Sequence, residues 1–128
     1  LYTAAIAARL ADEGKLDWNA SIHKYVPGYP ASHQFTLLQL AGHLAGIRHY
    51  AGTDPVFKRG YGATLRDGLA IFQSDPLLSA PGTKYQYTSY GYNLFGAALE
   101  HAGGADFLTL LRTTVTAPLG VQSPQGDD

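Results

Sequence analysis

The stretch Pro81-Gly82-Thr83-Lys84-Tyr85-Gln86-Tyr87-Thr88-Ser89-Tyr90-Gly91-Tyr92-Asn93-Leu94-Phe95-Gly96 combines three local signals. The Pro-Gly pair at its start is typical of a turn, and the alternating tyrosines at 85 and 87 favour a short extended segment. The residues from Tyr90 onward have the spacing of a helix. Tyr87 is therefore predicted at the junction between extended and helical backbone, where a side chain can be held firmly and still face a cleft.

The rest of the chain is predicted to be mainly helical, with long loops and with strand only at residues 84–87. Thr36 and Gln39 have capping-box spacing, and so do Thr64 and Asp67. Gly14 is a good terminator for the first helix. The predicted helices cover residues 2–13, 36–46, a stretch that begins at 64, 90–102 and 105–115, with a short helical turn at 21–25.

Composition narrows the possible functions. The chain has 128 residues and a net charge of −1, which suits one domain or part of one and disfavours nucleic acid or an anionic membrane surface as partner. No apolar run is long enough for a membrane span. The sequence has no cysteine and no methionine, so Leu1 is not a translation start. We expect a segment of a longer protein, because no capping residue precedes the first helix.

Several segments, in order, resemble one family. Ala11-Asp12-Glu13-Gly14-Lys15-Leu16-Asp17 is similar to the region after the nucleophile helix of class C β-lactamase-like proteins. Phe35-Thr36-Leu37-Leu38-Gln39-Leu40-Ala41-Gly42-His43-Leu44-Ala45-Gly46-Ile47 resembles their ITxxxLLxHTSGI segment, and Pro118-Leu119-Gly120 their PLGM ending. The resemblance extends over nearly the whole chain and places it in the serine β-lactamase and penicillin-binding-protein superfamily. Residues 47–50 look closest to the mitochondrial serine β-lactamase-like proteins and their bacterial relatives.

The resemblance implies which part of the protein this is. Members of the family use a Ser-x-x-Lys motif, a tyrosine motif and a Lys/His-Thr/Ser-Gly motif. The first is expected just before Leu1 and the third beyond Asp128. Residues 1–128 would then be one helical segment, truncated at both ends, of a β-lactamase-like domain whose parent is α/β, with an antiparallel sheet flanked by helices. The chain alone is predicted to be inactive because these two motifs are absent from it.

The resemblance also implies a reaction and two site residues. The parent would be a serine acyl hydrolase acting on a small-molecule or peptide substrate, with no cofactor and no metal. Tyr87 matches the catalytic tyrosine, and Ser89 stands at the substrate-binding position where many members have Asn. A free tyrosine ionises near pH 10, so it needs neighbouring lysines to act as a base. A hydroxyl donates fewer hydrogen bonds than an amide, which makes an ester or peptide at least as suitable a substrate as a β-lactam.

Other functions remain open at this point. The chain could be a non-catalytic helical binding or scaffold module, and the tyrosines at 85–92 could stack on a sugar. His43 and His49 are six residues apart, unlike the i, i+4 pair of helical zinc sites. Asp12 and Glu13 are adjacent and should point apart into solvent. A small-residue face on the first helix, exposed without its sheet, predicts self-association through Ala4, Ala8 and Ala11.

Overall fold

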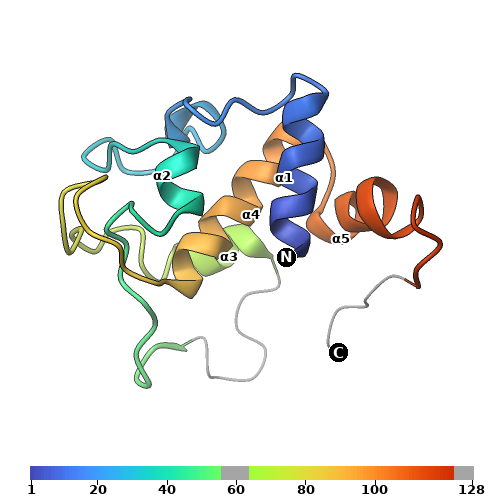
Figure 1. The fold of residues 1–128 in the computed structure, drawn as a ribbon. Helices are drawn as coiled ribbons and strands as arrows, with labels where there is room; N and C mark the ends of the chain where they lie inside the picture. Colours follow the sequence, from blue (N-terminus) through green and yellow to red (C-terminus); the bar gives the residue numbers. More distant parts are fainter. Residues whose placement is uncertain (56–63, 123–128) are drawn as a thin grey trace.

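A computed structural model describes residues 1–55 and 64–122 of the chain. Within these ranges the regular structure is helical apart from one isolated antiparallel bridge between Ser21 and Thr36, which confirms the mainly α prediction (Figure 1). No helix in these ranges is both long and apolar enough to cross a bilayer. The elements are α1 (Tyr2–Asp12), the 3₁₀ turn η1 (Ile22–Lys24), α2 (Leu37–Ala41), α3 (Leu65–Leu69), α4 (Ser89–Gly103), α5 (Phe107–Leu111) and the π-helical turn η3 (Arg112–Thr116).

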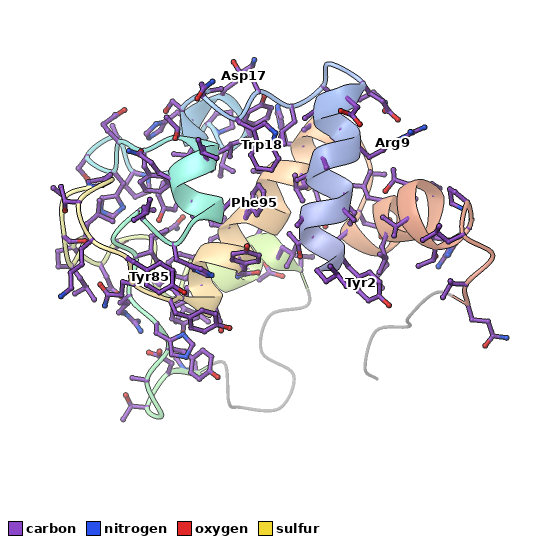
Figure 2. All side chains as sticks on the ribbon, viewed as in Figure 1. Tyr2, Arg9, Asp17, Trp18, Tyr85 and Phe95 are labelled. Atoms are coloured by element: carbon purple, nitrogen blue, oxygen red, sulfur yellow. The ribbon has the colours of Figure 1, made fainter. Side chains whose placement is uncertain are left out.

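The central element is α4, against which α1, α2, α3 and α5 all pack. Figure 1 shows α4 crossing behind α1, with α2 and α3 near its first half. Its side chains Leu94, Phe95 and Leu99 are fully buried. Phe95 meets Trp18 at a ring-centroid distance of 6.0 Å in the middle of the molecule (Figure 2). The core therefore forms around one apolar helix, and the residues before that helix are anchored to the core.

Predictions that rest on two residues within one helical turn are confirmed. Thr36 and Gln39 form the predicted capping box at the start of α2, and Thr64 and Asp67 form one at the start of α3. On α1, Ile6 and Leu10 are buried. The last turn of α4 is followed by Gly104 in the left-handed region at φ 70°. Such caps satisfy backbone groups that a helix end leaves unpaired.

Two predicted helix boundaries and the predicted strand were wrong. The helix expected at 36–46 ends at Ala41, because His43 takes a φ of 58°, which no α-helix accommodates. The last helix begins at Phe107 instead of Ala105, since the Asp106 side chain caps it. The segment at 84–87 forms no β-ladder: the N–H of Gln86 donates to the carbonyl of His43 at 2.9 Å, and no strand lies beside it in the described ranges.

Candidate active site

Tyr87 immediately precedes the residue that caps α4. Its side chain is 59% exposed, and within the described residues its hydroxyl makes no hydrogen bond. Its ring centroid lies 4.8 Å from that of His43 and 5.5 Å from that of His49. The phenol is thus accessible to solvent while two imidazoles pack against it.

Thr88 anchors the backbone next to Tyr87. It is 2% exposed and sits in the extended region at φ −148° and ψ 127°. Its hydroxyl donates to the carbonyl of Arg48 at 2.6 Å and accepts the N–H of Gly91 at 3.2 Å. The second bond is the N-cap of α4. One buried hydroxyl therefore starts the helix and joins it to the loop that follows α2.

The loop after α2 supplies two further hydrogen bonds. Nδ1 of His43 accepts the N–H of Thr88 at 3.3 Å, and Nδ1 of His49 accepts the N–H of Ser89 at 3.1 Å. The ring of His43 also stacks on Tyr92 at a centroid distance of 4.9 Å. Burial disfavours the imidazolium ion and lowers the pKa of His43. The spacing of His43 and His49 is unlike that of a helical pair, yet the structure places both rings against Tyr87.

Tyr85 extends this cluster of rings. It lies edge-on to His43 at 5.8 Å, and its side chain is 64% exposed. Figure 2 shows Tyr85 beside the N-terminal end of α4, far from Arg9 on the other side of the molecule. Aromatic rings thus surround His43 on a part of the surface that Tyr87 shares.

Ser89 is the first residue of α4, two positions after Tyr87. Its backbone is held by His49, and its side chain is half-buried. Among the described residues its hydroxyl makes no hydrogen bond, so it can donate to or accept from a bound molecule. The structure therefore brings the two predicted site residues together at one helix end.

Arg48 holds the loop that presents both histidines. Its guanidinium donates to Asp75 at 2.6 Å and to both carboxylate oxygens of Asp54, at 2.8 and 3.2 Å. It also donates to the carbonyl of His49 at 3.1 Å and lies 5.1 Å from the ring centroid of Tyr90. Planar, bidentate pairing of this kind fixes geometry as well as charge.

Arg48, Asp54 and Asp75 form a charged clamp in which each group stabilises the charge of its partner. Hydrogen bonds from Arg48, from the backbone of Ala51 and from Tyr90 hold the pKa of Asp54 well below its usual range. Bonding to Asp54 and then Asp75 raises the pKa of Arg48. Burial, followed by the 2.7 Å hydrogen bond to Asp54, raises the pKa of Tyr90 to about 12. Sequence reasoning missed this clamp, although the two Asp-Pro pairs at 54–55 and 75–76 were a visible signal.

The expectation that the sequence lacks a Ser-x-x-Lys string needs correction, because Ser21-Ile22-His23-Lys24 has that spacing. In the structure, Ser21 caps η1, and its Oγ lies 3.0 Å from Nδ1 of His23. The ammonium of Lys24 is 5.4 Å from the ring centroid of Tyr25. Among the described residues no hydrogen bond joins the side chains of Ser21 and Lys24, because Ser21 is engaged with His23 and Lys24 lies over Tyr25.

A groove beside α1 is another candidate site, and Tyr87 does not line it. The groove, of about 490 Å³, lies between α1 and the α5–η3 segment, lined among others by Arg9, Lys15 and Thr113. Glu13 pairs with Lys15 at 2.9 Å and with Arg9 at 3.2 Å, and the hydrogen bond from Lys15 lowers its pKa. Asp12 and Glu13 are both exposed, as expected. No group of three or more metal-ligating side chains occurs in the described part of the chain.

Comparison with known families identifies the family to which this helical chain belongs. The chain belongs to the Beta-lactamase family, whose model matches residues 1–127. It is 27% identical to the D-alanyl-D-alanine-carboxypeptidase/endopeptidase AmpH of Escherichia coli over 95% of its length. This match covers 33% of the Escherichia coli protein.

Solved structures have the same fold. The Beta-lactamase/D-alanine Carboxypeptidase from Yersinia pestis is 28% identical with a TM-score of 0.78, over 98% of this chain and 39% of that one. The hydrolase EstCE1, described as having promiscuous acyltransferase activity, has a TM-score of 0.79 at 22% identity, over 94% of this chain and 36% of that one; at that identity the likeness shows the fold alone. The chain thus spans about a third of the length of the relatives it matches.

Proposed function

We propose that residues 1–128 are the middle portion of a serine acyl hydrolase that acts through a serine acyl-enzyme. The substrate would be a D-Ala-D-Ala peptide, a β-lactam or an ester. The observation that carries the proposal is the exposed phenol of Tyr87, whose neighbouring amides are fixed at the start of α4. Membership of the Beta-lactamase family supports it.

In this reaction, a serine oxygen attacks the substrate carbonyl carbon, and Tyr87 takes the serine proton and passes it to the departing amine or alcohol. The carbonyl carbon loses its bond to that leaving group and stays bound to serine until water hydrolyses the ester. Ser89 would hydrogen-bond the substrate. We propose that the nucleophilic serine lies four places before Leu1 and its lysine directly before Leu1, with the third motif after Asp128.

A fluorescent penicillin or fluorophosphonate tests the proposal on the longer natural protein. Tyr87→Phe should slow acylation about 100-fold or more, the range for loss of a general base. Tyr29→Phe is the matched control, because Tyr29 is a largely buried residue whose hydroxyl makes no hydrogen bond in the described residues, and it lies outside the cluster of rings. A longer protein with no labelled serine would refute the proposal and favour a non-catalytic helical module.

The 128-residue chain itself should turn over neither nitrocefin nor p-nitrophenyl esters. Turnover that is lost in Ser21→Ala would identify a local nucleophile, and this would contradict the placement of the serine before Leu1. Turnover lost only in Tyr87→Phe would contradict the placement equally. Each variant removes a single hydroxyl group at a different position, so each serves as the control for the other.

We also propose that the chain self-associates through α1. Ala4 and Ala8 are exposed on this helix, and Ala11 is half-buried. Light scattering should then show a mass that rises with concentration, and Ala8→Glu should suppress the rise because it places a charge on the contact face. A constant monomer mass at high concentration would contradict this proposal.

A further inference from the structure

Two successive backbone amides are bound by two histidines on one loop. The N–H groups of Thr88 and Ser89 follow Tyr87 directly and donate to Nδ1 of His43 and of His49. These amides lie at the N-terminus of α4, where a helix has no partner of its own for its first N–H groups. The imidazoles therefore supply acceptors that the helix lacks.

This arrangement fixes the protonation state of both rings. An imidazole nitrogen that accepts a hydrogen bond carries no proton, so both histidines must be neutral with the proton on Nε2. The positive end of the α4 dipole also disfavours an imidazolium ion at this place. The lowered pKa of His43 agrees with a neutral ring.

The same two rings pack on the phenol. Centroid distances of 4.8 and 5.5 Å to Tyr87 mean that each imidazole touches both the side chain and the backbone after it. The histidines are themselves held: His43 by stacking on Tyr92, and His49 by the Arg48 guanidinium on its carbonyl. A shift of either imidazole would therefore move the phenol.

We propose that His43 and His49 are paired positioning residues for Tyr87, which hold it only while both imidazoles are neutral. That Tyr87 carries out chemistry rests on the proposed function, whereas the positioning itself does not. Protonation at Nδ1 turns an acceptor into a donor that faces an N–H group, so both hydrogen bonds break. Acidification then removes two of the three bonds that hold the backbone on which the phenol is mounted, and leaves the bond from the Thr88 hydroxyl to the Arg48 carbonyl.

The groups around the two rings decide which charges act on them. Tyr85, Tyr87 and Tyr92 contact the ring of His43, and Tyr50 and Tyr87 contact that of His49. The nearest charge on the same segment is Arg48, which Asp54 and Asp75 neutralise. Hence none of the carboxylates in the described residues pairs with either ring to favour its charged form.

The experiment uses the 128-residue chain labelled with ¹⁵N. Imidazole nitrogen resonances report the tautomer of each histidine, and hydrogen exchange reports the protection of single amides after correction for the intrinsic pH dependence. Measurements run from about pH 8 to about pH 5, on both sides of the ordinary imidazole pKa of about 6.5. Both rings should be Nε2-protonated tautomers at high pH. Protection of Thr88 and Ser89 should fall about tenfold as each ring gains its proton.

Two internal amides separate this effect from general opening of the segment. The N–H of Gln86 donates to the backbone carbonyl of His43, and that of Gly91 to the Thr88 hydroxyl. Neither acceptor titrates in this range, so both amides should keep their protection. A parallel loss at all four amides would overturn the proposal, as would an Nδ1-protonated tautomer at high pH.

Matched variants complete the test. In His49→Asn, the amide oxygen takes roughly the place of Nδ1 and does not titrate, so the Ser89 amide should stay protected at every pH. In His49→Leu, it should lose protection at every pH. His43→Asn suits the left-handed φ of 58° at that position. Equal protection in the Asn and Leu variants would contradict the proposal. If a variant unfolds, the wild-type tautomers decide the matter alone.

A final measurement joins positioning to function in the longer protein. Acylation by wild type should fall in acid, and acylation by His49→Asn should fall less. If the longer protein shows no labelled serine while Nδ1 of both histidines still accepts its hydrogen bond, the proposed function is refuted and the positioning role of the two histidines is not. If acylation is normal but Nδ1 of the histidines does not accept these hydrogen bonds, the positioning role is refuted and the proposed function is not.

Discussion

The hydroxyl of Thr88 offers the sharpest test of how the site is built. Thr88→Val keeps the shape of the side chain and suits the extended backbone at φ −148°. It removes both the bond to the Arg48 carbonyl and the N-cap of α4. Thr88→Ser is the matched control, because it keeps both bonds and removes only a buried methyl group.

The magnitudes of the two changes separate well. Loss of an N-cap costs about 1 kcal/mol, and an unpaired buried carbonyl costs about 1–3 kcal/mol. The added methyl of valine returns up to about 0.8 kcal/mol. We therefore expect the free energy of unfolding to fall by about 2–3 kcal/mol in Thr88→Val and by about 1 kcal/mol in Thr88→Ser.

Urea denaturation of the 128-residue chain measures this difference. With a slope of about 1–3 kcal/mol per molar urea, the midpoint of Thr88→Val should lie about 1–2 M below that of wild type. The slope itself should not change. A valine variant that is no less stable than the serine variant would refute the reasoning, because the two hydrogen bonds would then contribute nothing.

Three further changes test the scaffold. Gly46→Ala should destabilise by more than about 1–2 kcal/mol in urea, because φ is +78° and a Cβ would overlap the Ser79 carbonyl; exposed Gly28→Ala should stay within about 0.5 kcal/mol. Leu99→Ala should cost about 2–5 kcal/mol in the same assay, since this side chain is fully buried; a smaller loss would mean that α4 is not central to the core. The lowered pKa of Asp54 stabilises the fold above the unfolded pKa of about 4 and ceases to do so as pH falls. The melting temperature should therefore drop on acidification, and a drop of equal size in Asp54→Asn would contradict this role.

The sequence predicted best what depends on neighbours along the chain. The capping boxes at Thr36 and Thr64 need partners three residues away, so their pattern is legible without the fold. The Tyr87 motif is similar: it lies directly before a helix whose cap, Thr88, accepts from Gly91. These features required no knowledge of how distant segments meet.

What the sequence did not reveal depends on distant pairs. Arg48 and Asp75 are 27 residues apart, and Tyr90 and Asp54 are 36 apart. No local pattern predicts such partners, because the path of the intervening loops decides them. The placement of His43 and His49 was not predicted, for a second reason. A spacing of six separates two side chains on a continuous helix, but α2 ends at Ala41, before His43, so that geometry does not apply to these two residues.

A proton-transferring phenol, the role proposed above for Tyr87, has to satisfy two opposing requirements: its oxygen must be accessible to the reacting atoms, and its position must be fixed. Tyr87 cannot gain its fixation from burial, since more than half of its side chain is exposed. A permanent hydrogen bond to its hydroxyl would also fix the ring, but it would make the hydroxyl unavailable for proton transfer. The remaining means is to hold the backbone, and three bonds from the segment at 43–49 do so at the two residues that follow. The position of the phenol is therefore set from a loop about 40 residues upstream. On the proposed function, variants of that loop should alter acylation in the longer protein without touching the substrate.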